Sequence, residues 1–238
     1  MCGRYRLTRA QQIVADEFDE IQDLHIDIRD IMTWRPRYNI APMQVAPVLL
    51  VDGGQTVLRT HRWGLVPGWA REAKIGAQAI NARCETVAEK PMFRAAFKKR
   101  RAVVPASGFY EWQLTADGKV PYSIQARSGR TLYFAGLWEE WVDKSDPDLT
   151  SLVTFTVVTC PPNATMQGIH DRMPVVLPPE QVRAWLDPDT RPTVLTAMMA
   201  PANDTLLDAY PVSPAVGSVR NDSPALIERV ELQRRLFG

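Results

Sequence analysis

The middle of the chain carries a series of strand-like segments that strongly limits the folds it can adopt. Ala102–Trp112, Pro121–Ala126, Leu132–Trp138 and Leu152–Thr159 read as strands, and turn-rich or charged stretches such as Asp143–Asp148 separate them. Short strands at this spacing are typical of antiparallel sheets and barrels. We therefore expect a mainly antiparallel sheet or an open barrel.

A hairpin and several short helices complete the expected architecture. Val45–Val51 and Thr56–Arg62 read as strands joined by a turn at Gly53-Gly54. Helical spacing and capping residues predict helices at Thr8–Phe18, after Pro91, at Pro179–Leu186, at Thr193–Met199 and from Ser223 to about Leu236. No repeat, low-complexity tract or linker divides the chain, so we expect an α+β fold in one domain spanning residues 1–238.

Charge and cysteine content narrow the classes of function. Lys and Arg number 28 against 27 Asp and Glu, so contact with nucleic acid would need a local basic patch. The three cysteines are widely spaced and odd in number, which indicates a reducing compartment without a disulfide framework. No charged-then-apolar leader and no apolar run of about 18 residues is present. We expect a soluble, cytoplasmic protein with no membrane partner.

The second residue is a candidate nucleophile. Cys2 is small enough that Met1 should be removed after translation, which leaves a thiol and an α-amine two carbons apart. The amine titrates near about 8 and the thiol near about 8.5, so both nucleophilic forms exist close to neutral pH. An aldehyde that meets such a 1,2-aminothiol forms a Schiff base and then a thiazolidine ring. The alternative is a chance cysteine at a frayed terminus.

Three isolated polar residues are candidate acid/base or positioning groups. Glu111 stands between Tyr110 and Trp112, where a carboxylate is either exposed on the alternate face or held for chemistry. His170 could be a satisfied structural residue, and Asn81 could bond to a turn.

Metal and nucleotide chemistry find little support in the sequence. Cys2, Cys84, Cys160 and His170 are suitable ligands for zinc, but no Cys-x-x-Cys or His-x-x-x-His pair is present. No phosphate-binding loop or dinucleotide fingerprint appears either. We expect no metal and no cofactor.

Two further segments of the sequence each allow two interpretations. The segment with Trp63 and Trp69 is either a loop packed down by its rings or a platform for a base. The run Lys98–Arg101 is either a solvated helix end or a phosphate clamp.

Seven ordered blocks give the chain a resemblance to a known family from Met1 to about Asn221. They are Cys2–Tyr5, Arg37–Pro42, Trp63–Pro67, Ile80–Arg83, Gly108–Trp112, Phe134–Trp138 and Ile169–Pro174. The chain resembles the SOS response-associated peptidase (SRAP) family, whose members shield abasic sites in single-stranded DNA by linking to them covalently. The resemblance implies the SRAP fold and a DNA-damage enzyme with lyase-type crosslinking chemistry and peptidase activity on its own N-terminus. It also implies a monomer that joins the nucleoid when bound to DNA.

The resemblance also assigns roles to residues. Cys2 matches the crosslinking cysteine, Asn81 the residue that holds the sugar and the N-terminus, Glu111 the proton-transferring carboxylate and His170 the helper in ring opening. Seven further residues fall on or beside positions where the family contacts the DNA strand: Arg4, Asn39, Pro42, Trp63, Trp69, Arg83 and Arg172.

The chain departs from the family pattern at two positions, and two other functions remain open. Cys84 adds a thiol close to the expected site, and Ala70 stands where some members carry a second ring after Trp69. One rival function is an N-terminal-nucleophile amidohydrolase that uses the α-amine of Cys2 as general base. The other is a non-catalytic single-strand binder, for which Cys2→Ala would leave all activity intact.

Overall fold

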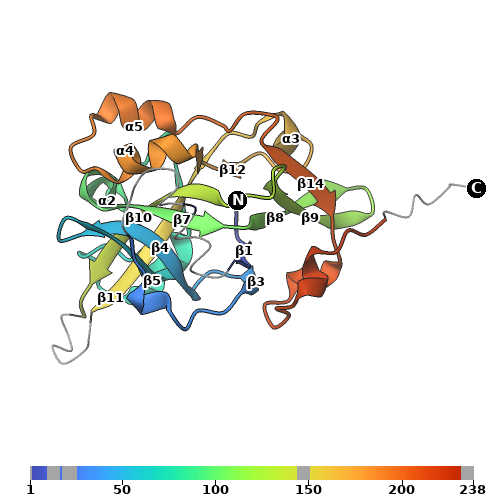
Figure 1. Ribbon diagram of the computed structural model, residues 1–238, viewed down its shortest axis with the longest axis horizontal. Helices are drawn as coiled ribbons and strands as arrows, with labels where there is room; N and C mark the ends of the chain where they lie inside the picture. The colour runs from blue at the N-terminus through green and yellow to red at the C-terminus, as the bar shows by residue number, and fades with distance from the viewer. Residues whose placement is uncertain (1, 10–16, 18–25, 144–150, 232–238) are drawn as a thin grey trace, which may run out of the picture.

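Strands dominate the computed structural model, which describes residues 2–9, 17, 26–143 and 151–231 (Figure 1). The strands are β1 (Tyr5–Leu7), β2 (Ile26–Asp27), β3 (Arg37–Ile40), β4 (Val45–Asp52), β5 (Gln55–Trp63), β6 (Asn81–Arg83), β7 (Arg101–Ala106), β8 (Gly108–Thr115), β9 (Gly118–Ala126), β10 (Leu132–Trp141), β11 (Leu152–Cys160), β12 (Met173–Pro174), β13 (Val176–Leu177) and β14 (Leu207–Pro211). The α-helices are α2 (Arg94–Lys99), α3 (Ala164–Gln167), α4 (Val182–Leu186) and α5 (Pro192–Met198). The 3-10 helices are η1 (Arg29–Ile31), η2 (Ala73–Gln78), η3 (Pro179–Gln181), η4 (Pro214–Gly217) and η5 (Pro224–Ile227).

Five strands close into a barrel. They pair in the order β11-β10-β7-β4-β5, and β5 returns to β11 through a parallel contact in which Arg62 faces Thr154 and Trp63 faces Phe155. The other four pairings of the ring are antiparallel. The expected α+β fold with mainly antiparallel strands is confirmed, and the expected open barrel is closed.

The N-terminal strand lies inside the second sheet, whose order is β14-β9-β8-β1-β3. Tyr5 pairs with Phe109 of β8 on one side and with Ile40 of β3 on the other, both antiparallel. A chain terminus usually frays, but a strand paired on both edges is held along its length. The segment that contains Cys2 therefore leads directly into an ordered sheet.

The segment Ala102–Trp112, which the sequence predicts as one strand, is divided between the two sheets. β7 ends at Ala106 in the barrel, and β8 begins at Gly108 in the second sheet. At Gly108 an added Cβ would lie 2.5 Å from the carbonyl oxygen of Ile124 and 2.7 Å from the guanidinium carbon of Arg6. The glycine allows β8 to start in close contact with its neighbours β9 and β1 in the second sheet, and composition alone did not reveal the break between β7 and β8.

An aromatic cluster packs where the two sheets meet. Trp63 stacks on Phe155 with ring centroids 6.2 Å apart, and the ring of Tyr5 meets Trp63 edge-on at 5.3 Å. Tyr5 also packs edge-on against Phe134 at 6.4 Å. Aromatic pairs in these geometries add to the gain from burial. The cluster thus joins the N-terminal strand to the barrel.

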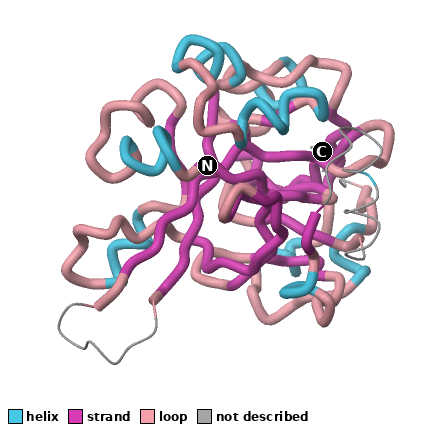
Figure 2. Tube along the Cα trace, turned by 60° about the vertical axis from the view of Figure 1, so that its left-hand side comes forward, coloured by secondary structure: helices cyan, strands magenta, loops and turns pink. Residues whose placement is uncertain are grey.

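The hairpin and three helices agree with the sequence predictions. β4 and β5 pair in register from Val45 opposite Arg62 to Asp52 opposite Gln55. The expected helices after Pro91, at 179–186 and at 193–199 appear as α2, as η3 followed by α4, and as α5. Helices lie around the outside of the strands (Figure 2). Of the helices in the described ranges, none is both long and apolar enough to cross a membrane.

The predicted C-terminal helix is wrong over residues 224–231. Only the 3-10 turn η5 forms, and the backbone at Glu228 is already extended, with ψ of 132°. The N–H of Val230 then donates to the carbonyl of Pro211, and Arg229 bridges to Val212. Pairing with the end of β14 thus replaces the helix. Residues 232–238, and 10–16 and 18 of the predicted helix Thr8–Phe18, lie outside the described residues.

The close packing around Gly108 can be tested by mutation. Gly108→Ala should lower the free energy of unfolding by about 2–4 kcal/mol, because the new methyl group would clash with the backbone carbonyl of Ile124 and with the buried guanidinium of Arg6. Urea denaturation would measure the change. Gly168→Ala is the matched control, since its Cβ would meet nothing within 4 Å. Equal stability of the two variants would contradict the argument.

Candidate functional site

Cys2 is held in place by its backbone. The N–H of Tyr110 on β8 donates to the carbonyl of Arg4 over 2.9 Å, which extends the pairing of β1 towards the N-terminus. The side-chain amide of Asn81 donates to the carbonyl of Cys2 over 2.8 Å. The Cys2 thiol itself is fully buried, and its sulfur lies 3.9 Å from the carbonyl oxygen of Arg4. Cys2 is therefore positioned through its backbone, and the thiol adds a long hydrogen bond to the Arg4 carbonyl.

Asn81 reaches this position from the barrel. It begins β6, which pairs in parallel with β11 so that Asn81 faces Val157. The preceding carbonyl, that of Ile80, accepts a bond of 2.8 Å from the indole of Trp63. The Oδ1 atom of Asn81 is buried and has no hydrogen-bond partner among the described residues. A buried acceptor without a donor is costly, so this atom is suited to receive a donor from a ligand or from a freed amine.

Glu111 places a carboxyl group beside Cys2. It lies in β8 and is only 2% exposed. Desolvation raises the pKa of Glu111 to about 7, because burial disfavours the charged form. Burial also raises the pKa of the Cys2 thiol strongly, and the negative charge of Glu111 adds to this effect. Near neutral pH the carboxyl group can thus accept or donate a proton, while the thiol remains protonated.

His170 faces the same carboxyl group from the loop between α3 and β12. Its Nε2 atom lies 3.8 Å from Oε2 of Glu111. The backbone N–H of Arg172 donates to Nδ1 over 3.0 Å, so the neutral ring carries its proton on Nε2, towards Glu111. Asp171 also lies 2.9 Å from Nδ1, but its side chain is 85% exposed. Because burial lowers the pKa of His170, we assign the neutral tautomer with the proton on Nε2.

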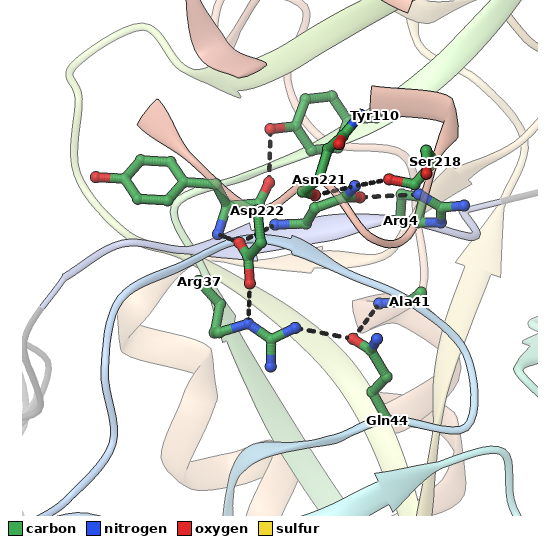
Figure 3. A network of polar contacts seen from close by, with 10 residues as sticks. Arg4, Arg37, Ala41, Gln44, Tyr110, Ser218, Asn221 and Asp222 are labelled. Atoms are coloured by element: carbon green, nitrogen blue, oxygen red, sulfur yellow. Dashed lines mark hydrogen bonds and ion pairs between the residues drawn. The ribbon is translucent and has the colours of Figure 1, made fainter. Parts of the chain in front are cut away.

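Arg4, which is expected to contact the DNA strand, hydrogen-bonds to the C-terminal segment (Figure 3). Asn39, expected in the same role, binds that segment as well. Nη1 of Arg4 donates to Oδ1 of Asn39 over 2.9 Å and to the carbonyl of Val216 over 2.8 Å. The amide of the fully buried Asn39 donates to the carbonyls of Ser218 and Asn221. These two side chains therefore fasten the segment after β14 to β1 and β3.

Asp222 completes this network and was not found from the sequence. Its carboxylate accepts from the backbone N–H groups of Tyr38 and Asn39 and pairs with the guanidinium of Arg37 (Figure 3). The residues are more than 180 positions apart in the chain, and no local pattern signals such a contact. The network explains the polar character of the Arg37–Pro42 block without involving a ligand.

Arg172 is occupied by an internal ion pair. Its two terminal nitrogens bind the two carboxylate oxygens of Glu85 at 2.5 and 3.0 Å, and one of them also donates to the carbonyl of Thr159. These hydrogen bonds hold the pKa of Glu85 down to about 2. Cys84 lies beside the pair, and burial raises the pKa of its thiol. Arg172 is 8% exposed, and a contact with phosphate would have to compete with Glu85.

The other residues that we expect to contact the DNA strand differ in solvent exposure. Trp63 is fully buried, so it packs the core and presents no ring to a base. Pro42 is half-buried in the turn after β3, next to Met43, whose N–H donates to the carbonyl of Trp63. Trp69 is 58% exposed, and Arg83 is exposed at the end of β6, two residues after Asn81. Trp69 and Arg83 are therefore available at the surface.

The arrangement suits acid/base and nucleophilic chemistry at one carbon centre. A backbone-anchored cysteine, a carboxyl group with a pKa near neutrality and a neutral imidazole with its N–H towards that carboxyl group converge from separate elements. In the described part of the chain, no group of three or more His, Cys, Asp and Glu side chains is arranged to hold a metal ion.

Comparison with known proteins identifies the family. The family model for "SOS response associated peptidase (SRAP)" matches residues 1–219. The abasic site processing protein YoqW of Bacillus subtilis is 41% identical over 232 residues, which cover 96% of this chain and 99% of that one. The abasic site processing protein YedK of Escherichia coli is 30% identical, with 97% and 100% covered. A crystal structure of a Bacteroides thetaiotaomicron protein has the same fold, with a TM-score of 0.85 at 24% identity over 97% and 100% of the two chains. The chain therefore belongs to the SRAP family.

Proposed function

We propose that this protein recognises abasic sites in single-stranded DNA and shields them through a covalent thiazolidine link to Cys2. Its relatives in Bacillus subtilis and Escherichia coli are named abasic site processing proteins. The observation that carries the proposal is the convergence of Asn81, Glu111 and His170 on Cys2. Asn81 holds the Cys2 carbonyl at 2.8 Å, and Glu111 lies 3.8 Å from His170 while its charge acts on the Cys2 thiol.

The proposed reaction requires Cys2 to be N-terminal, with Met1 removed. The α-amine adds to the aldehyde carbon of the ring-opened deoxyribose, and the carbinolamine loses water to give an imine. The thiol sulfur then adds to the imine carbon, and the thiol proton passes to the nitrogen. One carbon–nitrogen bond and one carbon–sulfur bond form, the aldehyde oxygen leaves as water, and no oxidant or cofactor takes part.

Glu111 is suited to the proton transfers in this sequence. Loss of water from the carbinolamine needs an acid, and addition of a protonated thiol needs a base. A carboxyl group whose pKa is about 7 supplies both forms at neutral pH. The N–H of His170 points towards the same carboxyl group and can stabilise its charged form. Asn81 acts as a positioning residue through the Cys2 carbonyl.

In this proposal, binding of single-stranded DNA depends on a few exposed side chains. The net charge of +1 gives no general attraction for DNA, so local contacts must supply it. Arg83 stands at the surface two residues from Asn81, and Trp69 offers an exposed ring for stacking. Contacts with phosphate position a strand without reading its bases, which suits a lesion that lacks its base.

An N-terminal-nucleophile peptidase is the second candidate function, because the family is described as a peptidase family. The same Cys2 thiol would attack an amide carbonyl with the α-amine as general base. The strongly raised thiol pKa makes the free thiolate rare, so this route also needs a base beside the sulfur. The two candidates differ in product, since only the first leaves the protein attached to DNA.

Replacement of the nucleophile tests the thiazolidine. Cys2→Ser should abolish the heat-stable adduct with abasic single-stranded DNA, because an alcohol closes at most an oxazolidine, which hydrolyses readily. A denaturing gel and the mass of the intact protein would show the loss. Cys84→Ser is the matched control and should crosslink as the wild type does, since Cys84 lies beside the Arg172–Glu85 pair. A stable adduct in Cys2→Ser would refute the mechanism.

Glu111→Gln tests the proton transfers. We expect crosslink formation and its reversal both to slow by about 10²- to 10⁴-fold, and the inflection near pH 7 in the rate profile to disappear. Time courses of adduct formation, and of release to excess competing abasic DNA, would measure both steps. Wild-type rates in the variant would reduce Glu111 to a structural carboxyl group.

Although Glu111→Gln should crosslink more slowly, its stability relative to the wild type should increase as pH rises. The folded-state pKa of Glu111 lies above its ordinary value of 4.5, so the wild type loses stability as pH rises from about 4.5 to about 7. Gln carries no charge and escapes this loss. The melting temperature of Glu111→Gln relative to wild type should therefore rise over this pH range, which also shows that slow crosslinking is not caused by unfolding.

Arg83→Ala tests the strand contact. The variant should bind single-stranded DNA more weakly whatever its sequence, and the slope of log K against log salt should fall by about 0.7, as expected for one lost phosphate contact. Titrations at several salt concentrations would measure it. Arg94→Ala, an exposed arginine on α2, is the control and should bind as the wild type does. A loss confined to particular sequences would contradict a phosphate contact.

A further inference from the structure

A groove with an apolar floor lies between α2 and the segment that joins α4 to α5, and we name it the α2–α5 groove. Its volume is about 720 Å³. Phe97 and Leu195 form the floor and are almost fully buried. Ala95, Pro188 and Pro192 form walls that are exposed to solvent. These helices lie together on one side of the barrel in Figure 1.

Cations surround the opening of the groove. Arg94 and Lys98 project from successive turns of α2, and Arg191 stands across from them before α5. All three are exposed, and none forms an ion pair within the described part of the chain. Asp189 is the acidic member among the described residues that line the groove. The rim is therefore positive, in a protein whose net charge is only +1.

A buried arginine makes the groove rigid. Arg101 lies beneath it and donates to the carbonyls of Phe97 and Lys98 at the end of α2, and to those of Trp185 and Asp187 at the end of α4. The guanidinium thus joins the two walls through carbonyl groups that helix ends leave without partners. Phe97 also packs edge-on against Trp185 at 6.1 Å. A site already formed before binding avoids the cost of ordering it.

The shape and chemistry of the groove favour a peptide over a nucleic acid strand. Single strands bind where exposed aromatic faces stack on bases, but the ring in this groove, Phe97, is only 6% exposed. The exposed Trp69 does not line this groove. An apolar floor within a cationic rim instead matches a chain that carries carboxylates beside an apolar side chain.

From this complementarity we propose that the α2–α5 groove is a docking site for an acidic peptide segment of a partner protein. An apolar side chain of the segment fills the space above Phe97 and Leu195, and its carboxylates face Arg94, Lys98 and Arg191. The contact is separate from the Cys2 site, so it recruits the protein without taking part in crosslinking. This site is not needed for the proposed function and stands independently of it.

Binding of a defined probe tests the proposal. The probe is a fluorescein-labelled peptide of four aspartates followed by Leu-Phe, and fluorescence anisotropy with the full chain measures its affinity. Arg94→Glu combined with Lys98→Glu should weaken binding roughly tenfold or more and reduce its salt dependence. Ala95→Trp, which fills the wall without changing charge, should weaken it as well. Lys119→Glu, exposed on the β8–β9 hairpin, is the matched charge control and should bind normally.

The outcomes separate the possible occupants. Peptides with lysines in place of the aspartates, or with alanines in place of Leu-Phe, should bind at least tenfold more weakly than the probe. The groove variants should crosslink abasic DNA at wild-type rates, so failure of the docking proposal leaves the proposed function standing. Absence of probe binding would overturn the docking site. Loss of single-strand affinity in the Arg94/Lys98 variant would also overturn it and would assign these cations to phosphate.

Discussion

The pairing of β1 on both edges is the constraint on which the site depends. A strand of three residues, Tyr5–Leu7, is held between β3 and β8, and the bond from Tyr110 to the Arg4 carbonyl continues this order towards Cys2. Asn81, from the barrel, then fixes the Cys2 carbonyl. A terminus ordinarily has the lowest local stability in a fold. Here it is held by both sheets, so a small backbone shift in either sheet would displace the thiol.

Three buried ionisable residues differ in how their loss of hydration is compensated. Arg6 and Arg172 are almost fully buried, but Arg6 donates to Ser123 and Gln125, and Arg172 is paired with Glu85. These hydrogen bonds and the ion pair compensate for the hydration that the two guanidinium groups lose on burial. Glu111 is just as buried, yet desolvation prevails and moves its pKa to about 7. Glu111, whose pKa is moved close to neutrality, thus lies beside the nucleophile, as expected for a reactive site.

Local patterns predicted the local parts of the structure, and long-range contacts account for the rest. The β4–β5 hairpin and α2 follow from neighbouring residues, as does the isolation of Glu111 among rings. Closure of the barrel depends on Phe155 meeting Trp63, which are 92 positions apart, and no spacing rule encodes that contact. The bond between Asp222 and Tyr38 has the same origin. The internal partners of Arg4 and Arg172 were likewise not visible, because a sequence shows a charge but not the distant groups that bind it.

The intramolecular contacts of Arg4 and Arg172 bear on how the protein would bind DNA in the proposed mechanism. The guanidinium of Arg4 is bound to the C-terminal segment and that of Arg172 to Glu85, so a DNA phosphate would have to compete with these contacts, whereas Arg83 is exposed. Non-covalent binding should then be weak and fast to reverse at physiological salt. The proposed covalent link would tolerate weak binding, because its carbon–sulfur bond rather than the phosphate contacts would set the lifetime of the complex. In the proposed mechanism, weak attraction would also let the protein leave intact DNA quickly, so that selectivity would arise from the aldehyde and not from affinity for the DNA backbone.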